Sequence, residues 1–219
     1  MSPIFVRSLP FGLYIAILIV ESLLPDRVPG FDLRWLYPMK AGLVALALAL
    51  LWRHYTELKS YALPFRHLLL SLVVGLLVFV LWIKLDADWM LIGELGNGFN
   101  PTDANGKLDW MWVAFRLSGA ALVVPVMEEL FWRSFIQRWI QKADFLTLNP
   151  AQIGLKAVLV ASALFAVAHL QWLAGLVAGL VYGWLYVRTR NLWASVIAHA
   201  VTNGALGAYV VNTRQWSLW

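Results

Sequence analysis

Cysteine is absent from this chain of 219 residues. Its absence excludes disulfide bonds, thiolate zinc sites and cysteine nucleophiles together, so a reactive site must use oxygen and imidazole chemistry. Charged residues are scarce as well, at 13% of the chain, whereas 61% of the residues are hydrophobic. A soluble domain carries about 25% charged residues. This scarcity, with a mean hydropathy of +0.71, predicts an integral membrane protein.

The net charge of +5 does not indicate a nucleic-acid partner, because the 17 Lys and Arg residues lie singly between apolar runs. With a cytoplasmic N-terminus, ten of them fall on the cytoplasmic side: Arg7, Arg53, Lys59, Arg66, Arg133, Arg138, Lys142, Lys156, Arg188 and Arg190. Six fall on the other side, with Arg116 left inside a span: Arg27, Arg34, Lys40, Lys84, Lys107 and Arg214. This bias predicts an N-in, C-out topology, and we expect the membrane to be a bacterial cytoplasmic membrane.

Apolar stretches separated by charged breaks predict about seven transmembrane helices, since a helix needs ~20 residues to cross ~30 Å of hydrocarbon. The candidate spans are residues 8–24, 35–52, 68–85, 117–139, 152–170, 172–187 and 192–211. An eighth short segment is left open. The predicted fold is an all-α, polytopic helical bundle in a single membrane domain over residues 1–219. An acidic loop over residues 86–109 is its predicted external cap.

Residues 157–187 form a stretch of 31 residues without a formal charge. The stretch is too long for one span and too short for two full ones, so it predicts a tight helical hairpin with its turn near Gln171. Gly175, Gly179 and Gly183 repeat the G-x-x-x-G spacing in the second helix. That spacing predicts close helix packing.

A few polar and ionisable residues lie inside the predicted spans, where an ionised group costs several kcal/mol and is a functional candidate by default. They are Glu128, Glu129 and Arg133 on the fourth span, His169 on the fifth, and His199 with Asn203 on the seventh. Along a helix, Glu128, His169 and His199 lie ~15, ~20 and ~14 Å from basic residues at the cytoplasmic end. The three side chains therefore reach a similar depth.

Adjacent acids point ~100° apart on a helix, so Glu128 and Glu129 cannot share one task. Arg133 follows Glu129 by four residues, the favoured order for a helical ion pair, which leaves Glu128 free. Pro125 removes a backbone donor and is expected to bend the helix beside the free acid.

These residues can perform peptide hydrolysis. A desolvated carboxylate is a suitable general base, so we expect Glu128 to take a proton from water. Neutral His169 would hold that water or share the proton. His199 and Asn203 would donate hydrogen bonds to the oxyanion of a tetrahedral intermediate.

Three motifs resemble those of the CPBP family, which contains the CAAX proteases and the bacteriocin-processing enzymes. E-E-x-x-x-R begins at Glu128, F-x-x-x-H runs from Phe165 to His169, and H-x-x-x-N runs from His199 to Asn203. The resemblance covers residues 114–203 and includes the Ras-converting type of endopeptidase. It implies a catalytic core over residues 111–207, preceded by generic helices and a loop over residues 1–110.

The resemblance implies that Glu128 activates water with help from His169, and that His199 and Asn203 stabilise the oxyanion. Glu129 and Arg133 would form a supporting pair, and Phe165 would pack near His169. Ser134 stands where the family usually has glycine. The implied partner is a membrane-associated protein or peptide, with substrate lipidation left open.

The cofactor is left open between no metal and Zn²⁺. Glu128, His169 and His199 would supply two histidines and one carboxylate, a set that suits Zn²⁺. H-E-x-x-H is absent, so nothing local requires a metal. We favour metal-free catalysis.

Other classes of protein remain to be weighed. An aspartyl intramembrane protease is excluded because every Asp falls outside the spans, and a rhomboid because G-x-S-G is missing. A non-catalytic peptide-binding or immunity factor is the alternative, and a proton-coupled transporter is a third candidate. His54 and His67 flank a loop and are given no role.

Overall fold

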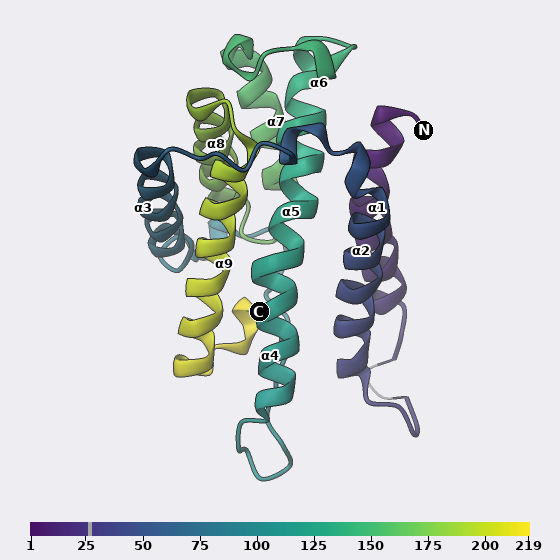
Figure 1. Cartoon of the computed structure of the whole chain (residues 1–219). Coiled ribbons are helices and arrows are strands. Elements are labelled where there is room, and N and C mark those ends of the chain that lie inside the picture. The colour runs from purple at the N-terminus through teal and green to yellow at the C-terminus, as the bar shows by residue number, and fades with distance from the viewer. Residues whose placement is uncertain (26–27) are drawn as a thin grey trace.

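The computed structural model describes residues 1–25 and 28–219, and this part of the chain forms a bundle of helices (Figure 1). The predicted all-α membrane bundle is confirmed. Arg27, one of the basic residues expected on the outer side, lies outside the described residues. The first three helices are α1 (Pro3–Ser22), α2 (Leu36–Leu51) and α3 (Phe65–Trp82).

The fourth predicted span is part of one long rod of 32 residues, Trp110–Gln141. The rod consists of α4 (Trp110–Ser118), a π-helical segment (Gly119–Val123), α5 (Val124–Glu129), a second π-helical segment (Leu130–Gln137) and α6 (Arg138–Gln141). The rod begins earlier than the predicted residue 117 because Asp109 caps its N-terminus. The Oδ1 of Asp109 accepts a hydrogen bond from the Met111 N–H at 3.0 Å.

The last three helices are α7 (Leu155–Val167), α8 (Trp172–Thr189) and α9 (Leu192–Thr213). The predicted hairpin is present as α7 and α8. The placement of His169 on a helix is wrong, because α7 ends at Val167 and His169 lies in the turn that follows. The N–H groups of Ala168 and His169 bond carbonyls three residues back, which tightens and ends the helix. At 13 residues, α7 is ~20 Å long and falls short of the ~30 Å hydrocarbon layer.

Glycines bring α7 and α8 into close contact, as their spacing predicts. A Cβ at Gly179 would lie 2.9 Å from Cα of Ser162, and one at Gly175 would lie 3.2 Å from Cα of Ala166. Only glycine allows this approach of the two backbones. The packing therefore sets the position of the turn that carries His169.

The turn between α7 and α8 is held by the chain that leaves α3. The Ile92 N–H donates to the Leu170 carbonyl at 2.7 Å, and Gln171 Nε2 donates to the Trp82 carbonyl at 3.0 Å. Trp172 Nε1 also donates to the Trp89 carbonyl at 3.1 Å. Such partners are needed because backbone at membrane depth must be hydrogen-bonded within the protein.

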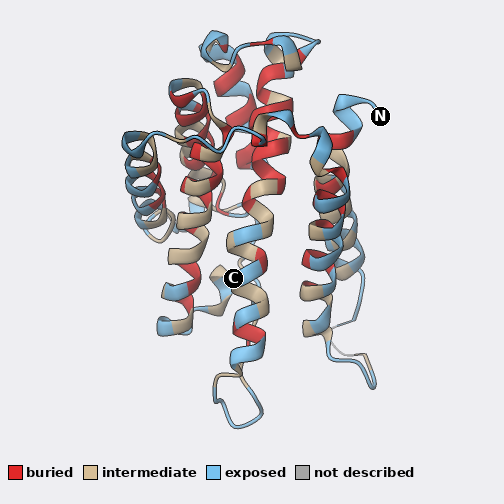
Figure 2. Ribbon diagram, in the orientation of Figure 1, coloured by how far each residue is buried: buried red, intermediate tan, exposed pale blue. Residues whose placement is uncertain are grey.

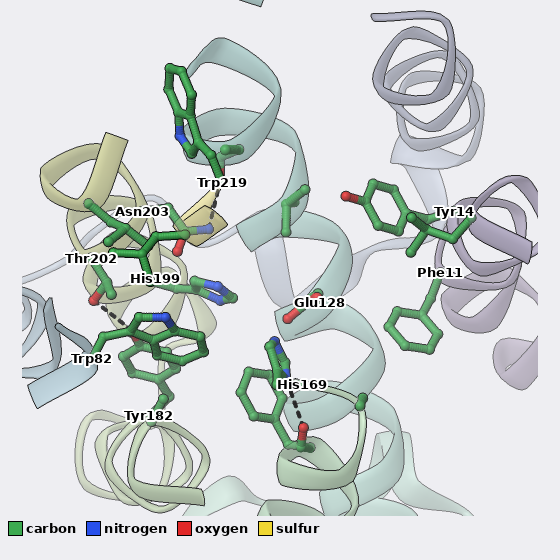
Figure 3. A pocket seen from close by; sticks show the side chains of 18 of the residues that line it. Phe11, Tyr14, Trp82, Glu128, His169, Tyr182, His199, Thr202, Asn203 and Trp219 are labelled. Atoms are coloured by element: carbon green, nitrogen blue, oxygen red, sulfur yellow. Dashed lines mark hydrogen bonds between the residues drawn. The ribbon is translucent and has the colours of Figure 1, made fainter. Parts of the chain in front are cut away.

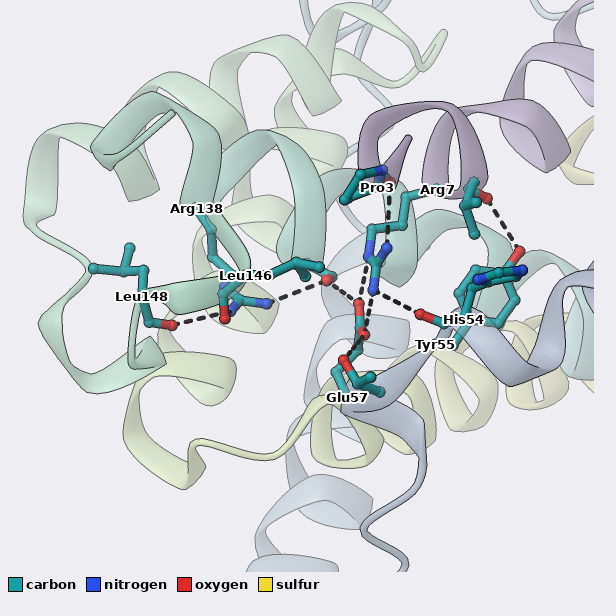
Figure 4. Close-up of polar contacts among 11 residues, drawn as sticks. Pro3, Arg7, His54, Tyr55, Glu57, Arg138, Leu146 and Leu148 are labelled. Atoms are coloured by element: carbon teal, nitrogen blue, oxygen red, sulfur yellow. Dashed lines mark hydrogen bonds and ion pairs between the residues drawn. The ribbon is translucent and has the colours of Figure 1, made fainter. Parts of the chain in front are cut away.

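At the other end of the bundle a polar clamp joins α1 to the rod (Figure 4). Arg7 donates to both carboxylate oxygens of Glu57, at 2.7 and 2.6 Å. Ser134, the residue that departs from the family motif, also donates to Glu57. Burial acts to raise the pKa of Glu57, but the hydrogen bonds and charge of Arg7, with the Ser134 hydroxyl, hold that pKa below its usual range. The clamp fixes α1 against the rod.

Five helices of the described residues are long and apolar enough to cross a membrane; the rod is one, and α1, α2, α3 and α9 are the others. Buried residues concentrate where α5 to α9 meet, whereas the outward faces of α1, α2 and α3 are exposed (Figure 2). Large apolar side chains such as Leu50 and Leu77 cover these exposed faces. The pattern suits a bundle surrounded by lipid, with its polar residues inside.

Candidate active site

Four polar residues predicted from the sequence line one cavity of about 250 Å³ (Figure 3). Glu128 comes from α5, His169 from the turn after α7, and His199 and Asn203 from α9. Apolar and aromatic side chains make up most of the remaining wall. The tertiary fold therefore brings together residues that are 75 positions apart in the chain, from Glu128 to Asn203.

Glu128 is buried, and its carboxylate faces the cavity beside His169 (Figure 3). Its Oε2 is buried and has no hydrogen-bond partner among the described residues. A buried carboxylate oxygen without a protein partner is available to a water or a substrate group. This acid is therefore the free one of the adjacent pair.

His169 is oriented by the carbonyl of Phe165, which accepts a hydrogen bond from Nδ1 at 2.7 Å. A carbonyl can only accept, so Nδ1 carries the proton and Nε2 of the neutral ring is an acceptor. The ring packs on Phe165, with centroids 4.4 Å apart, and against Trp82 at 5.6 Å. The predicted contact between Phe165 and His169 is present.

Glu129 joins two site residues. Its Oε2 lies 3.2 Å from Arg133 Nε, which is the predicted pair, although the N–H does not point at the oxygen and the contact is electrostatic. Its Oε1 accepts a hydrogen bond from Nδ1 of His199 at 3.0 Å. This second contact was not predicted. A carboxylate at Nδ1 orients the imidazole and leaves Nε2 for the cavity.

Aromatic rings pack around these charged residues. The Arg133 guanidinium lies 4.6 Å from the ring centroid of Phe165. Tyr182 stacks on His199 with centroids 5.1 Å apart, and its hydroxyl donates to Thr202 Oγ1 at 2.6 Å. The rings leave His199 little freedom to rotate. Tyr182 follows Gly179 by three residues on the glycine-lined face of α8, a spacing that could have identified it from the sequence.

Asn203 is held by a backbone carbonyl of the first π-helical segment. Val124 donates its N–H to the Gly119 carbonyl, and Pro125 has no N–H, so the Ala120 carbonyl loses both helical partners. Asn203 Nδ2 donates to that carbonyl at 2.9 Å. The second proton of Nδ2 remains for the cavity. The helix distortion predicted at Pro125 thus exposes a carbonyl that Asn203 binds from across the cavity.

The residues that line the cavity without having been predicted as site residues include Phe11 and Tyr14 of α1, and Arg116 of α4. The sequence of α1 carries no motif that separates these aromatic residues from lipid-facing ones. Arg116 was noted only as a charge inside a span. Its role depends on a contact between distant helices.

The arrangement of acids and histidines bears on whether the protein could hold a metal ion. Within the described residues, no three or more His, Cys, Asp or Glu side chains are close enough together to hold one. Glu128, His169 and His199 line the same cavity, and the hydrogen bonds made by Nδ1 of both histidines leave Nε2 of each ring unbound. No step of the chemistry below passes through a metal.

Comparison with known proteins bears on the same part of the chain. No curated protein and no solved structure matches the chain. Residues 110–205 match the family described as "Type II CAAX prenyl endopeptidase Rce1-like". The matched segment contains Glu128, His169, His199 and Asn203 and all three motifs. The resemblance to the CAAX proteases that those motifs indicated is therefore confirmed for the segment from residue 110 to residue 205, which is Rce1-like.

Proposed function

We propose that this protein is an intramembrane endopeptidase that hydrolyses a peptide bond of a membrane-associated protein or peptide, with Glu128 as general base. The observation that carries this proposal is the cavity shared by Glu128, His169, His199 and Asn203. The Rce1-like match over residues 110–205 supports an intramembrane protease in general.

In the proposed reaction, a water molecule lies between Glu128 and His169. The water donates one proton toward the Glu128 carboxylate and the other toward Nε2 of His169, which is an acceptor because Nδ1 is bonded to Phe165. Both protons are then directed away from the substrate. The lone pair of the water oxygen is free to attack the substrate carbonyl carbon.

The attack forms a C–O bond, transfers a proton from water to Glu128 and places negative charge on the former carbonyl oxygen. The remaining Nδ2 proton of Asn203 and Nε2–H of the His199 imidazolium would stabilise that oxyanion. Glu129 would hold the His199 ring in this orientation through its hydrogen bond to Nδ1. The intermediate collapses when the C–N bond breaks and Glu128 returns its proton to the leaving amine.

This reaction requires no metal ion, and we propose that catalysis is metal-free. The Arg133 guanidinium adds a positive charge near Glu129, which accepts a hydrogen bond from Nδ1 of His199. Positive charge beside a ligand set disfavours a divalent cation. The proposal predicts that a chelator leaves the activity of the purified protein unchanged.

Replacing the base tests the proposal. Glu128→Gln keeps the size and the hydrogen-bonding capacity of the side chain but cannot accept a proton from water, so turnover is expected to fall by about 10²- to 10⁴-fold. Cleavage is measured on a library of internally quenched apolar peptides in lipid nanodiscs. Glu94→Gln, an exposed loop carboxylate, is the matched control. Full cleavage by Glu128→Gln would contradict Glu128 as the general base. A protein that only binds peptide would cleave in neither form and would keep its peptide binding in Glu128→Gln.

A further inference from the structure

The chain turns back after α9 and returns toward the candidate active site (Figure 1). Arg214 ends α9 with a φ of 59°, and its N–H donates to the Val210 carbonyl at 2.7 Å, a hydrogen bond that caps the helix. A 3₁₀ turn, η9 (Trp216–Leu218), follows. It brings Leu218 and Trp219 into the wall of the cavity that contains the candidate site residues. We call residues 214–219 the return segment.

The return segment packs tightly against the loop before α4. A Cβ at Gly98 would lie 1.7 Å from the carbonyl oxygen of Trp216, so only glycine allows the two backbones to approach this closely. Phe99 packs edge-on against the Trp219 ring, with centroids 6.3 Å apart. Trp216 stacks on the same ring at 6.1 Å. These contacts hold the indole of Trp219 in one place.

The Trp219 ring packs on the face of α9 that carries Asn203. A Cβ at Gly207 would lie 3.4 Å from Nε1 and 3.5 Å from Cζ2 of Trp219. Gly207 follows Asn203 by four residues, so the two positions share a face and are ~6 Å apart along the helix. Trp219 and Asn203 also line the same cavity (Figure 3). An extended chain advances roughly 3.3 Å per residue, so the ring is about two residues from a carbonyl held by Asn203.

The same ring lies between two cavities. The first contains the site residues and has a volume of about 250 Å³, and a second of about 380 Å³ extends between α1, α2 and the loop before α4. Both cavities are lined by Tyr14, Leu18, Tyr37, Arg116 and Trp219. The first cavity is small for a ligand site, which typically has roughly 300–1,000 Å³. The Trp219 side chain therefore limits the space beside the site residues.

We propose that Trp219 determines which side chains a substrate can carry within about two residues of the cleaved bond, an inference that rests on the proposed endopeptidase function. A small side chain fits beside the indole, whereas a bulky one would overlap it, and overpacking against a wall that is held in place is unfavourable. An indole suits this task because it is large and has few rotatable bonds to order. Trp219 would touch a substrate side chain and not the reacting atoms, so it is a specificity-determining residue rather than a catalytic one.

The experiment varies the size of one substrate side chain. Internally quenched apolar peptides of one sequence carry alanine or tryptophan at each of the two positions on either side of the cleaved bond, which mass spectrometry locates. The full chain cleaves them in neutral-lipid nanodiscs. The unmodified protein is expected to prefer alanine over tryptophan at one or more of these positions by about 10- to 100-fold in kcat/KM. Trp219→Ala is expected to remove that preference, because the indole no longer fills the space.

Two further variants control for a purely structural role of the ring. Trp219→Phe keeps an aromatic ring and should keep most of the preference for alanine. Trp184→Ala removes an exposed tryptophan of α8 that lines neither of the two cavities, and should keep the preference fully. An equal change for all peptides in Trp219→Ala would show that the ring only packs the return segment and would overturn the proposal. A preference that persists in Trp219→Ala, or that is absent from the unmodified protein, would also overturn it.

Binding separates this inference from the proposed function. The fluorescence anisotropy of dansylated alanine-rich peptides, each with tryptophan at one position or at none, is measured with Glu128→Gln and with the double variant that also carries Trp219→Ala. Empty nanodiscs give the background. Weaker binding of a tryptophan peptide by Glu128→Gln, relieved in the double variant, supports the size limit even if no peptide is cleaved. Equal binding of all peptides by Glu128→Gln, or a difference that the double variant retains, contradicts it even if the protein proves to be a protease.

Discussion

Asn203 on α9 donates a hydrogen bond to the backbone carbonyl of Ala120, in the rod opposite, at 2.9 Å. The carbonyl is free because Val124 bonds to Gly119 and Pro125 has no N–H. The proline thus has a consequence across the cavity, where it fixes the amide proposed to stabilise the oxyanion. The π-helical segment and the Asn203 side chain therefore depend on each other.

Replacing Pro125 with alanine restores an N–H that competes with Asn203 for the freed carbonyls. We expect kcat of Pro125→Ala to fall by about tenfold, the effect of losing roughly 1.4 kcal/mol of oxyanion stabilisation, with little change in KM. Pro10→Ala is the control, because Pro10 is also inside a helix but belongs to α1 and not to the rod that carries Ala120. An unchanged kcat in Pro125→Ala would show that the proline does not affect catalysis through Asn203.

Two substitutions of His169 distinguish its nitrogens. Asparagine can retain a donor near the Nδ1 position but has nothing at Nε2, whereas glutamine places its amide near Nε2. Since Nδ1 is bonded to Phe165, Nε2 is the nitrogen assigned to the water. We expect His169→Asn to lose about 10²- to 10⁴-fold in kcat and His169→Gln to lose clearly less. The reverse order, measured by single-turnover cleavage, would exclude the proposed water contact.

The clamp of Arg7 and Glu57 makes stability depend on pH. The pKa of Glu57 is lowered, so its stabilising effect is complete above the unfolded value of ~4.3 and is lost as pH falls through the lower folded value. Glu57→Gln should cost about 3 kcal/mol at pH 7, because it leaves Arg7 buried without its charged partner.

Tryptophan fluorescence of the 13 Trp residues reports the thermal midpoint of each variant. The midpoints of Glu57→Gln and the unmodified protein should converge on acidification, and Glu94→Gln, an exposed carboxylate, should follow the unmodified protein. A constant difference between pH 7 and pH 3 would contradict the assignment.

Packing of α7 against α8 should control both stability and activity. Gly179→Ala places a Cβ 2.9 Å from Cα of Ser162, so the helices must separate at a cost of about 1–3 kcal/mol. The turn carrying His169 would move with α7, and cleavage should fall together with the thermal midpoint. Gly42→Ala, where nothing lies within 4 Å of the new Cβ, should preserve both. Equal behaviour of the two variants would refute the close approach.

The sequence by itself determined the helical membrane fold and singled out the four polar residues that line one cavity. Apolar length is a local property, and so is the four-residue spacing that pairs Glu129 with Arg133 and aligns His199 with Asn203. The ~1.5 Å rise per residue also placed the acid and the histidines at one depth before any contact was known. A single helix suffices for each of these inferences.

Only the tertiary structure decided which atoms are free. The end of α7 before His169 depends on its packing against α8 and on support from the chain after α3. The bond between Glu129 and His199 depends on where α9 crosses the rod, and that between Asn203 and Ala120 depends on a π-helical register. Such contacts join residues far apart in the chain through side-chain shape, which no local pattern encodes. For the same reason Arg116 was one charge in a span until α1, α2 and α4 placed it between two cavities.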